Sequence, residues 1–304
     1  MAEICLLGTG GMLPLPDRFL TSLYAEYNGK AVLIDCGEGT QVAIAKHGLK
    51  MSRIELILIT HCHADHVTGL PGLLLSAGNS SRTAPLEIAA PESCIPVIEN
   101  LMSVCGGLPY EVKLRALPDD RHFEFTADMI DPMLTVKTMP LSHRVSCLGY
   151  SLVLRKKPVF LPQNAKAMNI PVEFWKRLHS GETVTLEDGL RIPPEAVTGE
   201  KKPPLKITYV TDTLPVPELE LFAMDADLFV CEGMYGLPDK KDSMNEKCHM
   251  LMQDACNIAK LADARKLWLT HYSPAEKEPH VYEDELRKIF PETVVSDDGI
   301  SITL

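Results

Sequence analysis

The sequence of 304 residues lacks the long apolar run that a membrane-spanning helix requires. No stretch approaches the roughly 20 uninterrupted apolar residues needed, and the first fifteen residues show no basic segment followed by an apolar one, the pattern of a secretory signal. Internal repeats and low-complexity tracts are missing too. With 45% apolar and 23% charged residues, the composition is that of a soluble globular protein. We expect a cytoplasmic protein with no membrane partner.

The nine cysteines form no Cys-x-x-Cys pair. Their odd number and scattered positions argue against a disulfide framework and against a zinc ribbon. We interpret most of them as small buried apolar residues in a reducing compartment.

Positive charge is scarce overall but concentrated in one interval. The formal net charge is −11, and such an average field disfavours non-specific attraction to nucleic acid or to an anionic membrane. Residues 144–206 nevertheless carry eleven Lys or Arg against six acids, together with seven prolines. This interval predicts a basic arm inserted at residues 151–204 within one large domain, 1–304. A solvated surface excursion with incidental charge is the alternative.

Short apolar runs and helical patterns alternate along the chain, which favours layered α/β packing. Asn28-Gly29 between two of the runs is a strong hairpin signal. The runs predict strands at Ile4–Leu7, Leu23–Tyr27, Ala31–Ile34, Ile54–Ile59, Leu86–Ala89, Met133–Thr138, Leu148–Leu154, Ile207–Val210, Leu228–Cys231, Leu267–Leu269 and Ile300–Leu304. Helices are predicted at Gly39–His47, Cys94–Ser103, Val172–His179, Glu246–Leu261 and Val281–Ile289.

The most informative segment is His61-Cys62-His63-Ala64-Asp65-His66, directly after the predicted strand Ile54–Ile59. Imidazoles two residues apart in an extended segment point the same way and can chelate one ion. Asp65 and His66 follow where the chain turns into a helix, and they can face a second ion. Three histidines and a carboxylate in six residues rarely serve packing, because each buried imidazole needs a hydrogen-bond partner. The segment therefore predicts a metal site.

Candidate completing ligands follow other predicted strands. They are His143, Asp212 and His271, and a carboxylate with two oxygens can bridge two cations. Each of them alone would more often be an ordinary structural residue. Ligands at the ends of separate strands converge on one edge of a sheet, where α/β folds place their sites.

Such a set suits hydrolysis of a phosphodiester. Two dications about 3.5 to 4 Å apart make hydroxide available near neutral pH, and they clamp the attacking and leaving oxygens of an in-line displacement. Five imidazoles add no charge, and two carboxylates offset only half of the +4 of the ions. The resulting pocket is cationic and suits an anionic substrate.

The His-x-His-x-Asp-His run, followed in order by His143, Asp212 and His271, resembles the metallo-β-lactamase superfamily of binuclear metal hydrolases. More narrowly, the sequence is similar to the ribonuclease Z type of tRNA 3′-processing endonuclease. The supporting motifs extend over nearly the whole chain and comprise Leu7-Gly8-Thr9-Gly10, Asp35 to Gln41, Thr60 to His66, Gly69 to Leu74, Pro140 to His143, Gly181 to Gly189 and Thr270-His271.

The resemblance implies a four-layer αβ/βα sandwich of two mixed β-sheets with a protruding arm, and two metals at one edge. It implies two bound zinc ions, with manganese or iron as alternatives. It also implies an RNA-cleaving enzyme that acts on precursor tRNA and forms a homodimer. It assigns His61, His63 and His143 to one ion, Asp65, His66 and His271 to the other, and Asp212 to the bridge. Asp65 would be the proton acceptor, and His249 would assist at the leaving group.

Several motifs depart from the ribonuclease Z pattern. The family usually has Ser-Gly-Asp-Thr around the bridging aspartate, and this chain has Val210-Thr211-Asp212-Thr213. The family's His-Glu-Ala-Thr stretch is Cys231-Glu232-Gly233-Met234 here, and its Gly-Pro pair in the arm is absent from Asn169 to Val172. The set of metal ligands is complete, whereas the features that grip the substrate are altered.

Basic side chains in the arm are candidates for contacts with backbone phosphates, whose loss would weaken binding and flatten its salt dependence. Trp175 lies among helical residues and is more often a packing anchor than a platform for base stacking. The candidate substrate-binding residues are Arg155, Lys156, Lys157, Lys176 and Arg177.

Two other functions remain open on the sequence. The first keeps the metal chemistry but acts on a small phosphodiester or on a thioester, lactone or sulfate ester. The second is a catalytically silent protein that binds nucleic acid through a vestigial site. No predicted ligand has been lost from this chain, which argues against the silent protein.

Overall fold

The computed structural model describes residues 1–200, 202–236 and 241–304, with backbone only for 241–243. The described chain forms two compact units. One comprises Met1–Val153 with Lys206–Leu304, and the other, here called the arm, comprises Leu154–Leu205. Lys201, one of the basic residues counted in the interval 144–206, lies outside the described residues. None of the described helices has the length and apolar character needed to cross a membrane.

The first sheet of the larger unit has seven strands and is mixed. The pairs from β16 to β3 are antiparallel, and the pairs from β3 to β6 are parallel. The predicted hairpin at Asn28-Gly29 is confirmed: both residues have positive φ, 51° and 79°, as a tight two-residue turn requires. In spatial order the strands are β16 (Ser301–Thr303), β1 (Ala2–Gly8), β2 (Ser22–Tyr27), β3 (Lys30–Ile34), β4 (Ile54–Leu58), β5 (Leu86–Pro91) and β6 (Val112–Leu117).

The second sheet also has seven strands and is mixed. The pairs from β12 to β15 are parallel, and β7 pairs antiparallel with β8. Its order is β15 (Thr293–Val295), β14 (Leu267–Thr270), β13 (Leu228–Glu232), β12 (Leu205–Val210), β9 (Leu148–Leu154), β8 (Leu134–Pro140) and β7 (Phe123–Thr126).

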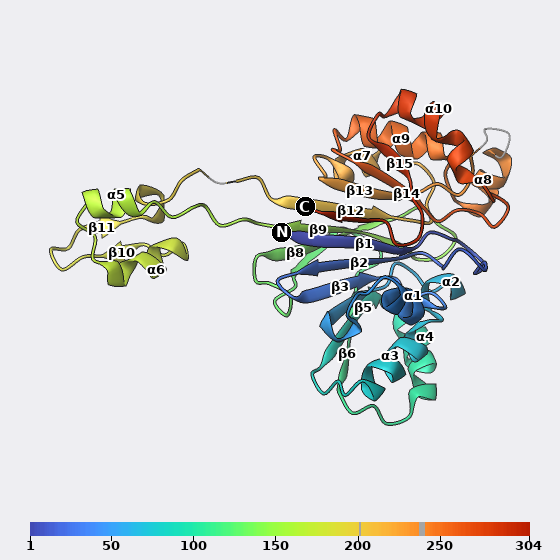
Figure 1. Ribbon diagram of the computed structural model, residues 1–304, viewed down its shortest axis with the longest axis horizontal. Helices are drawn as coiled ribbons and strands as arrows, with labels where there is room; N and C mark the ends of the chain where they lie inside the picture. The colour runs from blue at the N-terminus through green and yellow to red at the C-terminus, as the bar shows by residue number, and fades with distance from the viewer. Residues whose placement is uncertain (201, 237–240) are drawn as a thin grey trace. The chain divides into compact units, whose positions relative to one another are not determined.

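Helices cover the outer face of each sheet, so the larger unit is the predicted αβ/βα sandwich (Figure 1). The first sheet carries α1 (Thr40–Lys46), α2 (Ala64–Val67), α3 (Leu70–Asn79) and α4 (Ile95–Met102). The second carries α7 (Glu218–Ala223), α8 (Lys241–Lys247), α9 (Met252–Leu261) and α10 (Glu283–Ile289).

Alternation along the strands supplies apolar surface to both faces of each sheet. In β1, Cys5 and Leu7 join the cluster under the helices, while Ile4 and Leu6 are fully buried outside that cluster. Because successive side chains point to opposite faces, Ile4 and Leu6 face the second sheet. This double burial explains why the strands read as continuous apolar runs in the sequence.

The arm contains two helices, α5 (Pro162–Ala167) and α6 (Trp175–His179), and a two-stranded sheet of β10 (Val184–Thr185) and β11 (Arg191–Ile192). Its own small core includes Ile170, Leu178 and Val184. Trp175 packs on this core and donates its indole N–H to the carbonyl of Ile170 at 3.0 Å. The prediction that Trp175 is a packing anchor is confirmed.

The single helix predicted over Glu246–Leu261 is wrong. Helix α8 ends at Lys247, Cys248 has a φ of 58°, and α9 begins at Met252. The Met250 amide donates to the Glu232 carboxylate at 3.3 Å. The amide of Met252, the first residue of α9, donates to the Tyr235 carbonyl at 3.0 Å. These tertiary partners override the helical pattern and place His249 in a buried turn, where it is 5% exposed. The elements absent from the predicted list include β6, β7, β10, β11, β15, α5 and α7, and also α3, of which only the start of a helix was predicted.

Candidate metal centre

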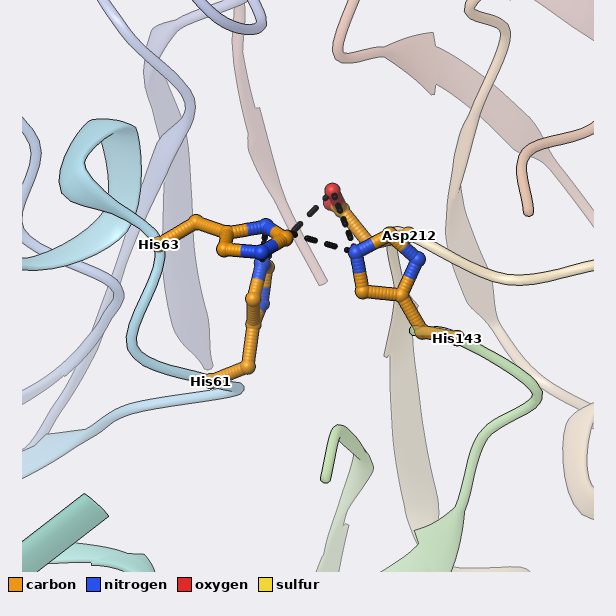
Figure 2. A group of neighbouring side chains, drawn as sticks. All are labelled: His61, His63, His143 and Asp212. Carbon is orange, nitrogen blue, oxygen red and sulfur yellow. Dashed lines mark hydrogen bonds and ion pairs between the residues drawn. The ribbon is translucent and has the colours of Figure 1, made fainter. Parts of the chain in front are cut away.

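The predicted metal ligands all follow strand ends at one edge of the sandwich. The segment from His61 to His66 follows β4, His143 follows β8, Asp212 follows β12 and His271 follows β14. Figure 2 shows His61, His63, His143 and Asp212 pointing toward one another from three separate segments. The structure brings the seven side chains together into two neighbouring groups of donor atoms.

The first group contains His61, His63, His143 and Asp212. His63 Nδ1 lies 3.0 Å from His61 Nε2 and 3.3 Å from His143 Nε2. Asp212 Oδ2 lies 3.6 Å from His61 Nε2 and 3.8 Å from His143 Nε2. Zinc–nitrogen bonds of about 2.0–2.1 Å in a tetrahedron put ligand atoms roughly 3.3 Å apart. The spacing of these donors fits one ion.

The second group contains Asp65, His66 and His271. The Nε2 atoms of His66 and His271 are 3.2 Å apart, and Asp65 Oδ2 lies 3.6 Å and 3.4 Å from them. Asp212 Oδ1 approaches the same two nitrogens at 3.3 Å and 3.2 Å. The two oxygens of Asp212 therefore face different groups, which is the arrangement a bridging carboxylate needs.

The backbone leaves three strands sharply to aim these side chains. Asp212 lies two residues after β12 with a φ of 56°, and His271 and Asp35, directly after β14 and β3, have φ of 59° and 60°. Left-handed backbone costs residues other than glycine of order 1–3 kcal/mol and persists where the surrounding structure enforces it. Its recurrence after three strands of the two sheets, at residues that are themselves proposed ligands or bond to one, marks this edge as a functional site.

Asp35 fixes the ring of His66. Its carboxylate accepts hydrogen bonds from His66 Nδ1 at 2.8 Å and from the Thr60 amide at 2.8 Å, and all three residues are fully buried. Because Nδ1 carries the proton, Nε2 is the free donor atom. Asp35 belongs to one of the motifs that resemble the family, but its role could not be predicted, because its partner lies 31 positions away in the sequence.

Glu232, at the end of β13, does the same for His249. It accepts from His249 Nδ1 at 3.1 Å and from the Thr213 amide at 2.6 Å. Burial lowers the pKa of His249, but the charge and hydrogen bond of Glu232 outweigh it and raise the pKa to about 9. His249 also lies within the donor cluster of Asp212 and His271, so its free nitrogen faces the metal centre. This role of Glu232 was not predicted.

The electrostatics of the cluster favour a cation. Burial would raise the pKa of Asp65 and Asp212, but the facing imidazoles hold both pKa values well below the usual range, so both remain anionic. Burial is the largest cause that lowers the pKa of His61, His63 and His143, which therefore stay neutral. His66 differs, because burial lowers its pKa but the carboxylates of Asp212, Asp35 and Asp65 outweigh burial and raise it. A divalent metal would take the place of the proton on its Nε2, since imidazoles bind metal in the neutral form.

The loop after β1 closes one side of the site. The Met12 amide donates to Asp65 Oδ2 at 2.7 Å, the oxygen that faces His66 and His271. A Cβ on Gly11 would lie 2.7 Å from the His271 ring, so only glycine fits there without moving the ring. This contact could be found only in the folded chain, because nothing in the Gly10-Gly11 pair specifies its neighbour.

Sequence and structure comparisons agree with this geometry. The chain is 42% identical over 305 residues to a ribonuclease Z of Lachnospira eligens, covering 100% of this chain and 98% of the relative. It is 44% identical over 300 residues to a ribonuclease Z of Clostridium acetobutylicum, covering 98% and 96%. The crystal structure of the short form of human tRNase Z matches with a TM-score of 0.70 and 24% identity, covering 99% of this chain and 98% of that one.

Fold and site together define a metallo-β-lactamase-fold protein whose histidine and aspartate cluster fits divalent metal. The chain belongs to the ribonuclease Z family, and its residues 2–168 also belong to the family described as anti-Pycsar protein Apyc1.

Proposed function

We propose that this protein is a zinc-dependent phosphodiesterase that cleaves precursor tRNA near its 3′ end. The observation that carries the proposal is the position of the Asp212 carboxylate between the two donor groups. Its Oδ2 faces one group and its Oδ1 faces the other. A carboxylate shared in this way is suited to two ions rather than one. Membership of the ribonuclease Z family supplies the substrate.

His61, His63 and His143 would hold one zinc ion, and Asp65, His66 and His271 would hold the other. Two zinc ions at these positions would supply a nucleophilic hydroxide near neutral pH and stabilise the charge that develops on the phosphate. Asp65 would accept the proton of the attacking water through Oδ1, because the Met12 amide and the facing imidazoles occupy Oδ2. His249, kept protonated by Glu232, would donate a proton to the leaving oxygen.

The arm would bind the RNA backbone. Arg155, Lys156 and Lys157 are exposed directly after β9 and have no ion-pair partner among the described residues, and Lys176 on α6 is exposed as well. Arg177 instead pairs with Glu182 at 2.9 Å within the arm, so we rank it below the other four. Unpaired cations lose no existing partner when they bind phosphate, which favours them as RNA contacts.

The decisive experiment compares substrates on one zinc-loaded sample. Precursor tRNA with a 3′ trailer, the same tRNA without it and bis(p-nitrophenyl) phosphate are incubated with the protein over a range of salt. We expect endonucleolytic release of the trailer and slower turnover of the small diester. Hydrolysis of the small diester with no cleavage of precursor tRNA would overturn the tRNA assignment and favour a small-molecule phosphodiesterase. Zinc-loaded protein that leaves both intact would refute a phosphodiesterase altogether.

A subunit contact is the remaining part of the proposal. The family resemblance implies a homodimer in the cytoplasm, and sedimentation equilibrium of the zinc-loaded protein tests the dimer. A mass of about 34 kDa at micromolar concentration would contradict it, since the chain itself has a mass of 33.6 kDa.

A further inference from the structure

The hydroxyl of Tyr235 is buried and lacks a hydrogen-bond partner among the described residues. The side chain is 6% exposed. The other buried tyrosines in the described part of the chain all donate to a named acceptor, and these are Tyr24, Tyr110, Tyr150, Tyr209 and Tyr272. A buried hydroxyl with no partner is destabilising, so its presence calls for an explanation such as a ligand that supplies the acceptor.

Tyr235 lies beside the metal centre. It follows β13, and it forms an isolated bridge with Leu251 in the turn that holds His249. Its ring meets the His249 ring edge-on, with the centroids 6.5 Å apart. The His249 ring in turn lies 5.4 Å from that of His143 and 5.6 Å from that of His271. One imidazole therefore separates Tyr235 from the proposed metal ligands.

Arg144 supplies an exposed cation on the same side. It directly follows His143 and has no hydrogen-bond or ion-pair partner within the described ranges. Burial and Glu232 raise the pKa of Tyr235, and the guanidinium of Arg144 opposes them. Burial also lowers the pKa of His63, and Arg144 lowers it further. Arg144 is the next residue after His143, whose ring lies 5.4 Å from that of His249, and this places an exposed cation beside the proposed metal ligands.

We propose that Arg144 and Tyr235 bind a phosphate group of the substrate next to the His143 and His249 side of the metal centre. The guanidinium offers paired N–H groups that match two oxygens of a phosphate, and the Tyr235 hydroxyl donates one further hydrogen bond. The proposal rests on the proposed phosphodiesterase function for the identity of the ligand. It assigns the substrate contact to two residues outside the metal ligands and outside the arm.

The pair is tested by Tyr235→Phe and Arg144→Gln in zinc-loaded protein, with two readouts. One is kcat/KM for bis(p-nitrophenyl) phosphate, and the other is the Kd for inorganic phosphate by calorimetry, which needs no turnover. In each variant kcat/KM should fall and Kd should rise by about ten- to a hundredfold, the range expected when a hydrogen bond to a charged group is removed. Arg144→Lys should recover part of the loss, because it restores the charge but not the paired N–H groups.

Controls separate binding from a structural role. Tyr110→Phe removes a hydroxyl that donates to the Leu74 carbonyl at 2.8 Å, and it should lower Tm without changing either readout. Arg121→Gln removes an exposed arginine paired with Asp120 and should change nothing. Tyr235→Phe should not lower Tm, because its hydroxyl has no hydrogen bond to lose within the described part of the chain. A lower Tm in Tyr235→Phe, or unchanged kcat/KM and Kd in both test variants, would overturn the proposal.

Failure of the phosphodiesterase function would look different. In that case the unaltered protein would not turn over the diester, yet it would bind inorganic phosphate, and both variants would weaken that binding. The pair would then stand as a phosphate site and the proposed reaction would fall.

Discussion

Asp35 Oδ2 accepts a hydrogen bond from His66 Nδ1 at 2.8 Å, and the side chains of both residues are inaccessible to solvent. Asp35 directly follows β3, and His66 lies in α2, the helix that follows the neighbouring parallel strand β4. The carboxylate selects which nitrogen of His66 is free to bind a metal. Metal affinity should therefore depend on a residue that is not itself a ligand.

Asp35→Asn tests this dependence. The amide cannot accept from His66 and from the Thr60 amide and hydroxyl as a carboxylate does, so we expect zinc affinity to fall about 10- to 100-fold. Competition with a zinc chelator measures the loss. Asp120→Asn, at an exposed position, is the control. Unchanged zinc affinity in Asp35→Asn would show that the ring of His66 is held by its other contacts.

Asp212→Ala should remove metal from both groups. We expect bound zinc to fall below one ion per chain and the rate on a phosphodiester to fall at least about 10²–10³-fold. Asp225→Ala is a matched control, because Asp225 is exposed and has the same φ of 56°. Elemental analysis after gel filtration measures the metal. Two ions retained in Asp212→Ala would refute the bridge.

Gly11→Ala should displace His271 together with its proposed donor atom, because the new Cβ would lie 2.9 Å from Nε2. The added methyl group would lie 2.7 Å from the imidazole, and a shift of about 1 Å in a catalytic group costs on the order of a hundredfold in rate. The group of Asp65, His66 and His271 should lose zinc first. Gly107→Ala introduces the same methyl group where nothing lies within 4 Å, and it should leave both metal content and rate intact. Equal behaviour of the two variants would contradict the close contact.

Glu232→Gln should slow catalysis through His249. We expect kcat to fall about ten- to a hundredfold with zinc content retained, because the amide no longer keeps His249 protonated. The double variant of Glu232→Gln and His249→Ala should lose no more kcat than His249→Ala alone, because the effects of residues that act through one another do not add. Glu218→Gln, an exposed carboxylate, serves as the control. Fully additive losses would assign Glu232 a separate role.

Replacing Lys156 and Lys157 with Ala should weaken RNA binding and spare a small substrate. Two lost phosphate contacts should reduce the slope of log K against log salt by roughly 1.5 to 2. Filter binding of precursor tRNA at several salt concentrations gives the slope. The double variant of Lys113 and Lys137, surface lysines outside the arm, makes the same charge change elsewhere. Equal loss on RNA and on the small diester would show that the arm has another role.

Sequence patterns over a few residues predicted the elements that depend only on neighbouring residues in the chain. Strand β4 and the turn at Asn28-Gly29 were readable because apolar runs and turn residues act over a few positions. The short spacing of His61 and His63 made the metal site visible for the same reason. The seven side chains predicted as ligands are brought together in the structure.

The unpredicted features depend on contacts between distant residues. Helix α9 begins six positions later than the helical pattern indicated, because Glu232 and the Tyr235 carbonyl bond the amides of Met250 and Met252. The partnerships of Asp35 with His66 and of Gly11 with His271 span 31 and 260 positions. No periodicity in a single sequence records such pairs, so their chemistry appears only when both sheets are in place.

The donor atoms of the cluster come from both sheets, with four ligands following β4 and the last one following β14. A ribosome makes the first of them long before it makes His271. During that interval the growing polypeptide has a set of chelating side chains but no complete centre. An unfinished chain would therefore lack nuclease activity. If translation stopped early, the truncated product would not cleave RNA.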